Sequence, residues 1–244
     1  MSCRKIPPRG LLLLVALGTL TATPMVASAE LARADAPEGF VTLFKGKDLT
    51  DWRGLAANPI QRADMSAQVL ATAQTAANER MRAHWHVIEG VLECDGMGEP
   101  GDNLCTSREY GNFEMYVDWR ILPGGDSGIY VRGTPQIQIW DPTDEAAWEN
   151  GSDKGSGAIW NNQHHDRFPL MKADHQVGEW NTFYIKMIGE RVTVKLNGQL
   201  VVDDAIMENY WAPDTPIPTK GSIELQSHGN KAWFRNIFVR DLPE

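Results

Sequence analysis

Residues 113–121 read Phe-Glu-Met-Tyr-Val-Asp-Trp-Arg-Ile, a run in which apolar and polar side chains alternate. Because successive side chains on a β-strand point to opposite faces, Phe113 and Val117 are expected to face a core, and Glu114 and Arg120 to face away from it. Similar short runs, separated by Gly, Pro and Asn turns, continue to the end of the chain. The pattern predicts an all-β protein, a sandwich of two antiparallel sheets.

Three later runs, at 128–132, 136–140 and 222–228, send unusual polar side chains to an expected outer face of the sandwich. The outward residues are Tyr130, Arg132, Gln136, Gln138, Trp140, Glu224, Gln226 and His228. A merely solvated sheet face is the plain alternative, since polar residues on outer faces are the default. However, hydroxyl groups need polar partners, and the C–H faces of a sugar ring stack on aromatic rings. We therefore predict a sugar-binding face, joined by Asp141 and Trp160 from adjacent loops.

One segment departs from the strand pattern. Residues 66–82 are rich in Ala, Gln, Glu and Met and contain no Pro or Gly, which is typical of a helix. We predict a helical insertion at about 62–84 that lies on the sandwich, within a single domain at 30–244. A second small domain is the alternative.

The N-terminus has the three parts of a secretory signal peptide. Basic residues precede the apolar run at 11–20, and Ala27-Ser28-Ala29 has the small-x-small pattern that signal peptidase cleaves. The apolar run is too short for a bilayer span. We expect residues 1–29 to be removed by cleavage near Ala29, so that the protein is periplasmic or secreted. A buried N-terminal helix is the alternative.

The charge of the chain disfavours some partners. The formal net charge is −9 at pH 7, which disfavours nucleic acid or an anionic membrane and fits a neutral or cationic small substrate. Cys94 and Cys105 could pair in an oxidising compartment, and their spacing leaves both outcomes open. His164 and His165 are a weak metal signal and are interpreted as surface histidines.

Short motifs recur in order along nearly all of the expected mature chain, at 39–52, 85–92, 110–132, 136–141, 156–160, 178–181, 196–198, 225–229 and 234–237. In this succession the sequence resembles the 3-keto-disaccharide hydrolase family. Two positions depart from the family's pattern. Asp126 stands where the family usually shows Asn, and Pro135-Gln136 stand where the family usually shows a Glu before the glutamine of the strand.

The resemblance implies a concanavalin-like jelly roll that cleaves the C1–O bond of 3-keto-glycosides, by hydrolysis or by elimination and hydration. A ketone at C3 acidifies the C2 proton, so elimination needs a base, an electrophile for the enolate oxygen and an acid for the leaving group. On strand geometry, His228 or Asp141 is the expected base, Arg132 or a divalent cation the electrophile, and Glu224 the acid. The residues expected to hold the sugar ring are Tyr130, Gln138, Trp140, Trp160 and Gln226.

Two rival functions stay open at this point. An ordinary glycoside hydrolase needs two carboxylates that face each other, and Asp141 with Glu224 is the pair that the sequence offers. A non-catalytic carbohydrate-binding module keeps the aromatic and amide residues but needs no base.

Overall fold

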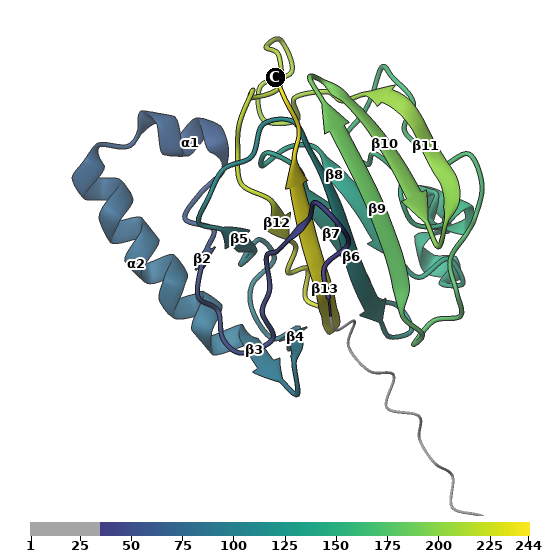
Figure 1. Cartoon of the computed structure of the whole chain (residues 1–244), viewed down its shortest axis with the longest axis horizontal. Helices are drawn as coiled ribbons and strands as arrows, with labels where there is room; N and C mark the ends of the chain where they lie inside the picture. Colours follow the sequence, from purple (N-terminus) through teal and green to yellow (C-terminus); the bar gives the residue numbers. More distant parts are fainter. Residues whose placement is uncertain (1–34) are drawn as a thin grey trace, which may run out of the picture. The chain divides into compact units, whose positions relative to one another are not determined.

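The computed structural model describes residues 35–244, and these form two antiparallel sheets packed face to face (Figure 1). The predicted all-β, jelly-roll sandwich is therefore confirmed. The predicted signal peptide at 1–29 lies outside the described residues.

The two sheets differ in size. The larger sheet has eight strands, in the order β11 (Gln199–Ile206), β10 (Arg191–Leu196), β9 (Asn181–Ile188), β6 (Phe113–Ile121), β13 (Ala232–Asp241), β4 (Val91–Cys94) and β3 (Trp85–Ile88), with β1 (Val41–Thr42) paired to β13. The smaller sheet has five, in the order β2 (Trp52–Gly54), β5 (Leu104–Thr106), β12 (Glu224–Leu225), β7 (Asp126–Tyr130) and β8 (Gln136–Trp140).

The core lies between the sheets and is made of the inward side chains that the alternation predicts. Phe113, Val117 and Trp119 of β6 are buried, as are Ile129 of β7 and Ile137 of β8. Burying a large apolar side chain stabilises the fold by about 1.5–3 kcal/mol. These core contacts fix which side chains of β7 and β8 point outward.

Strand β7 ends two residues earlier than predicted, which changes the position of Arg132. This residue lies beyond the strand with a φ of 55°, in the left-handed region that a continuing strand does not use. Its guanidinium donates to the backbone carbonyl oxygens of Gly111 and Gly189, so Arg132 does not join the outward side chains of β8 as expected. Tyr130 is the last outward residue of β7.

The single helix predicted at about 62–84 corresponds to α2 (Ala67–His84), and a separate short helix, α1 (Pro59–Asp64), precedes it. Asn58 and Gln61 form a capping box at the start of α1, and the Ser66 hydroxyl accepts a hydrogen bond from a backbone N–H in the first turn of α2. None of the helices within residues 35–244 is long and apolar enough to cross a membrane.

Helix α2 packs directly on edge strand β2, as Figure 1 shows. A Cβ atom at Gly54 of β2 would lie 2.2 Å from the carbonyl oxygen of Ala77, so only glycine lets the two backbones approach this closely. The Gly54 N–H donates to Asn78 Oδ1 at 3.0 Å. The insertion is thus anchored to the edge of the smaller sheet.

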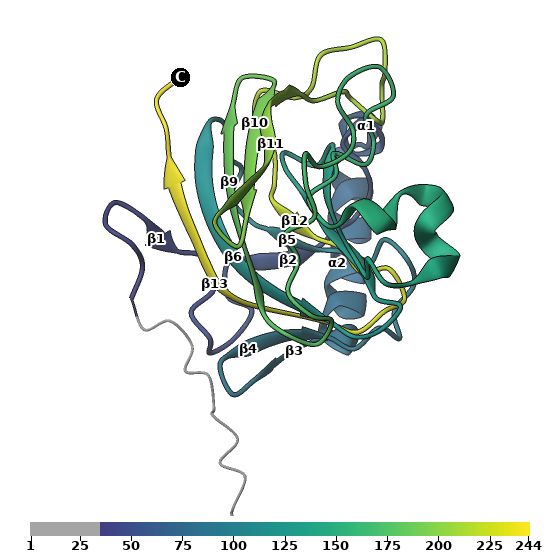
Figure 2. The same ribbon diagram turned by 90° about the vertical axis from the view of Figure 1, so that its right-hand side faces the viewer.

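Two short 3₁₀ helices, η1 (Glu145–Asn150) and η2 (Ser152–Lys154), follow β8. Figure 2 shows this segment, in teal, on the side of the smaller sheet that faces away from the larger one. The outer face of β7 and β8 is therefore partly enclosed.

The two cysteines within residues 35–244 are free thiols, one in each sheet. Cys94 lies in β4, where its Sγ donates to Ser227 Oγ at 3.7 Å, and Cys105 lies in β5. Burial raises the pKa of both thiols. Their spacing in the sequence left pairing open, and in the structure the two cysteines are unpaired.

Candidate functional site

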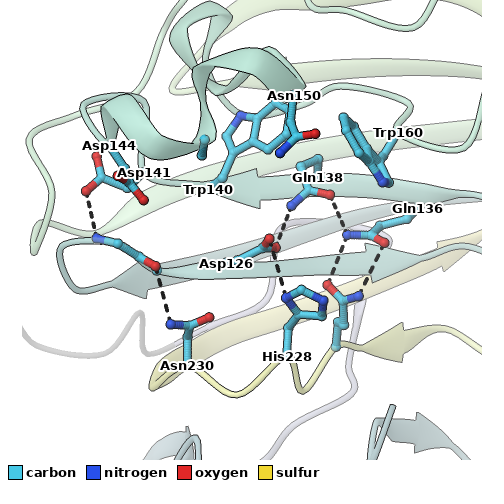
Figure 3. A pocket seen from close by; sticks show the side chains of 14 residues that line it. Asp126, Gln136, Gln138, Trp140, Asp141, Asp144, Asn150, Trp160, His228 and Asn230 are labelled. Carbon is cyan, nitrogen blue, oxygen red and sulfur yellow. Dashed lines mark hydrogen bonds and ion pairs between the residues drawn. The ribbon is translucent and has the colours of Figure 1, made fainter. Parts of the chain in front are cut away.

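A cavity of about 560 Å³ lies on the outer face of the smaller sheet (Figure 3). Outward side chains of β7 and β8 form its floor, and η1 and the chain after β12 form its sides. This volume falls within the range of about 300–1,000 Å³ that is usual for small-molecule sites. From the predicted sugar-binding face, the cavity brings together Gln136, Gln138, Trp140, Asp141, Trp160, Gln226 and His228.

His228 forms an ion pair with Asp126 at one side of this cavity. The His228 Nδ1 atom lies 3.4 Å from Asp126 Oδ2, while Asp126 Oδ1 accepts a hydrogen bond from Gln138 Nε2 at 2.7 Å (Figure 3). The Asp126 carboxylate raises the pKa of His228 above its ordinary value. Because the carboxylate holds the ring through Nδ1, proton exchange with a ligand falls to Nε2.

Asp126 was not among the predicted site residues, although its position carries a signal. It is the first residue of β7 and pairs with Trp140 of β8, and its side chain has the same parity as that of Tyr130. Because β7 begins two residues before the predicted start at Gly128, its outward parity adds Asp126 to the polar face.

A chain of side-chain amides covers the floor of the cavity. Gln136 Nε2 donates to Gln138 Oε1 at 2.7 Å, to Gln226 Oε1 at 3.0 Å and to the Ser127 carbonyl oxygen at 3.2 Å. Gly128 makes this arrangement possible, since a Cβ atom there would lie 2.2 Å from Gln136 Nε2. The amides of β8 and of Gln226, which directly follows β12, are thereby held in one orientation.

Two tryptophans form an aromatic wall. The rings of Trp140 and Trp160 lie 5.3 Å apart in an edge-to-face arrangement, and the Trp140 indole donates to the Gly155 carbonyl oxygen at 2.8 Å. The Arg167 guanidinium lies 3.8 Å from the centre of the Trp160 ring. Rigid aromatic surface next to fixed amides is the combination that sugar rings require.

Asp141 also lines the cavity, but its carboxylate holds a turn. It accepts hydrogen bonds from the Gly124 N–H at 2.9 Å and from the N–H and hydroxyl of Thr143 at 2.7 and 2.6 Å. Burial alone would raise the pKa of Asp141, but these hydrogen bonds lower it below its ordinary value. A carboxylate stabilised in this way is a weaker base than His228.

Arg132 lies outside the cavity that contains His228, and its hydrogen bonds connect surrounding loops. Its guanidinium donates to the carbonyl oxygens of Gly111 at 2.9 Å and Gly189 at 2.7 Å and to Asn112 Oδ1 at 3.2 Å, and it lines two other cavities. The predicted role for Arg132 as enolate stabiliser does not fit this position.

Glu224 and Tyr130 line a neighbouring cavity, and Gln226 lines both. Glu224 is only 2% exposed and accepts a hydrogen bond from Asn103 Nδ2 at 3.3 Å, and burial raises its pKa. Asp141 and Glu224 thus lie in different cavities, which disfavours the two-carboxylate alternative.

The polar loop with His164 and His165 is anchored from outside the cavity. Glu208 accepts hydrogen bonds from the N–H groups of Gln163, His164 and His165. Among residues 35–244, no group of three or more His, Cys, Asp or Glu side chains is arranged to hold a metal ion.

Comparison with known proteins places this architecture among carbohydrate-related proteins. Residues 39–240 match the model of the 3-keto-alpha-glucoside-1,2-lyase-like domain. A 3-keto-disaccharide hydrolase of Bacteroides thetaiotaomicron is 22% identical over 256 residues, which cover 84% of this chain and 79% of that protein.

Two crystal structures of candidate glycosyl hydrolases from Parabacteroides distasonis share the fold. One is 22% identical with a TM-score of 0.59 and covers 84% of this chain and 95% of the other. The second is 29% identical with a TM-score of 0.53, and the coverage is 78% and 99%.

Proposed function

Because this chain belongs to the 3-keto-alpha-glucoside-1,2-lyase-like domain family, we propose that it is a carbohydrate-active enzyme that cleaves the C1–O bond of 3-keto-glycosides. The observation that carries the proposal is the His228–Asp126 pair at the side of an amide-floored cavity. A binding module needs the amides and the aromatic wall but has no use for a histidine that is oriented by a carboxylate.

His228 is the base in this proposal. Its Nε2 atom removes the C2 proton of the 3-keto sugar, which leaves an enolate between C2 and O3. Asp126 stabilises the imidazolium that forms and keeps the ring in place through Nδ1. Raising the pKa of His228 makes it a stronger base once it has lost its own proton.

The enolate then expels the group on C1. The C1–O bond breaks, the leaving oxygen takes up a proton, and the product is an unsaturated 3-keto sugar. Water adds across the C1–C2 double bond, its oxygen to C1 and a proton to C2, so the net reaction consumes one water. Asn150 lines the cavity and carries amide N–H groups that can donate to the ketone oxygen as charge develops there. The N–H groups of Gln138 are already used by Asp126 and by backbone carbonyl oxygens.

The test compares two histidine variants on a 3-keto-glucoside. Replacement His228→Gln should lower kcat by about 10²–10⁴-fold, the usual contribution of a general base. His86→Gln is the matched control, since His86 is partly exposed and lies 3.5 Å from Asp95 in a similar ion pair on β3. We expect this control to keep wild-type turnover.

Two results would reject the proposal in different ways. Full turnover by His228→Gln would remove His228 as the base. A wild-type protein that binds glycans and turns over neither ordinary nor 3-keto sugars would instead be a binding module.

We also propose that the protein acts outside the cytoplasm, in the periplasm or after secretion. The support is the basic, apolar and small-x-small succession at residues 1–29. Fractionation of cells that express the full chain tests this, together with the mass of the mature N-terminus, which should begin after Ala29.

A further inference from the structure

A second cavity of about 460 Å³ adjoins the one that contains His228. Gln226 lines both, so its side chain marks the boundary between them. Polar side chains continue across this boundary, because Gln226 is hydrogen-bonded to Gln136 on one side and Tyr130 lines the second cavity on the other. A ligand longer than one sugar ring can therefore extend from the first cavity into the second along one row of polar groups.

The floor of the second cavity is polar and buried. Glu224 accepts hydrogen bonds from Asn103 Nδ2 and Ser222 Oγ, each at 3.3 Å, and has an exposure of 2%. Burial, followed by the nearby Glu224 carboxyl group, raises the pKa of Tyr130, so its hydroxyl stays protonated and can donate. Buried donors and acceptors of this kind recognise the hydroxyl groups of a neutral ligand.

An aromatic ring forms one wall. The Trp211 indole N–H donates to the Gly133 carbonyl oxygen at 3.0 Å, and the Tyr210 ring packs edge-to-face on it at 4.7 Å. Trp211 nevertheless keeps 36% of its surface exposed. With its N–H satisfied, this surface is the apolar part of the indole, which suits the C–H face of a sugar.

The helical insertion supplies further lining residues. Asn58, Pro59 and Gln61 at the start of α1 line the cavity, as does Arg80 of α2. Helix α1 is seated closely, since a Cβ atom at Gly133 would lie 3.0 Å from Pro59 Cγ. The insertion therefore lines the second cavity, where it can select between ligands that enter it.

The spacing along the chain suits two rings. Glu224 and His228 are four residues apart, so their Cα atoms are separated by at most about 14 Å. Glu224 lines the second cavity and not the first, so the sugar unit beside it is the one that follows the unit whose C2 faces His228. The geometry therefore disfavours Glu224 as the acid for the leaving oxygen and assigns it to binding.

We propose that the second cavity is the subsite for the leaving-group sugar of a 3-keto-disaccharide, with Glu224 and Tyr130 as its polar floor and Trp211 as its stacking surface. This inference rests on the proposed function, because it takes the first cavity to hold the 3-keto unit. It makes the insertion at α1 and α2 a determinant of substrate length.

The test measures kcat/KM for two substrates, a 3-keto-disaccharide and methyl 3-keto-glucoside, which has no second ring. We expect Trp211→Ala to lower kcat/KM for the disaccharide by about five- to tenfold more than for the methyl glycoside, through KM. Trp211→Phe keeps an aromatic face and should recover most of this loss. Thermal unfolding of both variants checks that the fold is retained.

Trp148→Ala is the matched control, since Trp148 is 46% exposed and its indole N–H also donates to a backbone carbonyl oxygen, that of Pro142. Trp148→Ala should change kcat/KM for both substrates by the same factor. Equal losses on both substrates for Trp211→Ala, or no loss on either, would overturn the subsite.

Failure of the proposed function gives a different result. If the wild type turns over neither substrate, the reaction is wrong, and titration calorimetry with the 3-keto-disaccharide and the methyl glycoside decides the subsite alone. A tighter Kd for the disaccharide that is lost in Trp211→Ala supports the subsite. Equal Kd values for wild type and variant overturn it.

Discussion

Replacement of Gly128 by alanine should disrupt the amide floor of the catalytic cavity. The new Cβ atom would lie 2.2 Å from Gln136 Nε2 and 2.6 Å from its Cγ, so the Gln136 side chain has to move. Gln136 is 2% exposed, and movement breaks its hydrogen bonds to Gln138, Gln226 and Ser127.

The size of the effect follows from these contacts. Each hydrogen bond contributes about 0.5–1.5 kcal/mol net. Alanine offsets about 0.4–1 kcal/mol of their loss by restricting the unfolded chain. The free energy of unfolding should therefore fall by about 1–3 kcal/mol in urea titrations. We expect kcat/KM for a 3-keto-glycoside to fall about tenfold, which corresponds to about 1.4 kcal/mol of lost transition-state binding.

Gly111→Ala is the matched control. The nearest atom to a Cβ at Gly111 is Lys220 Cε at 3.5 Å, an ordinary contact. This control should leave stability equal to the wild type or slightly higher, and activity unchanged. If Gly128→Ala is as stable and as active as Gly111→Ala, the amide floor does not position the substrate.

Two further predictions concern charged groups. Asp126→Asn removes the carboxylate that raises the pKa of His228, so the acidic limb of the kcat/KM profile should move to lower pH, and an unmoved limb would contradict the pairing. Glu208→Gln should lower the free energy of unfolding by about 1–3 kcal/mol at pH 7. Burial opposes the shift, but hydrogen bonds from Gln163 and its neighbours lower the pKa of Glu208 to about 2. The stability difference between wild type and Glu208→Gln should therefore be fully present above about pH 4.5 and shrink as the pH falls toward 2. Urea titration at several pH values measures it.

The parts of the fold that follow from alternation could be predicted from the sequence. The inward residues of β6, such as Phe113 and Val117, are the core, and the outward residues Gln138 and Trp140 of β8 line the cavity. These predictions hold because the period of two is a local property of each strand. The helix at α2 follows from composition for the same local reason.

The site residues that depend on strand ends and on pairing between distant strands could not be placed in this way. Arg132 was misplaced because β7 ends at Tyr130 and is followed by a turn, in which the Thr134 N–H donates to the Val131 carbonyl oxygen and Arg132 has a positive φ. Asp126 was missed because its partner, His228, is about a hundred residues away in sequence and becomes adjacent only through the sheet. Likewise, only the three-dimensional arrangement separates Glu224 from the His228 cavity.

The fate of the C2 proton tests the central claim most directly. The reaction is run in D₂O with a 3-keto-disaccharide, and the released 3-keto sugar is analysed by NMR against a sample without enzyme. Because the His228 side chain is 45% exposed, its proton exchanges with solvent, and elimination followed by hydration should place deuterium at C2. We predict C2 deuterium in the wild-type product and only background incorporation with His228→Gln. Wild-type cleavage that retains protium at C2 would show direct hydrolysis and contradict the account.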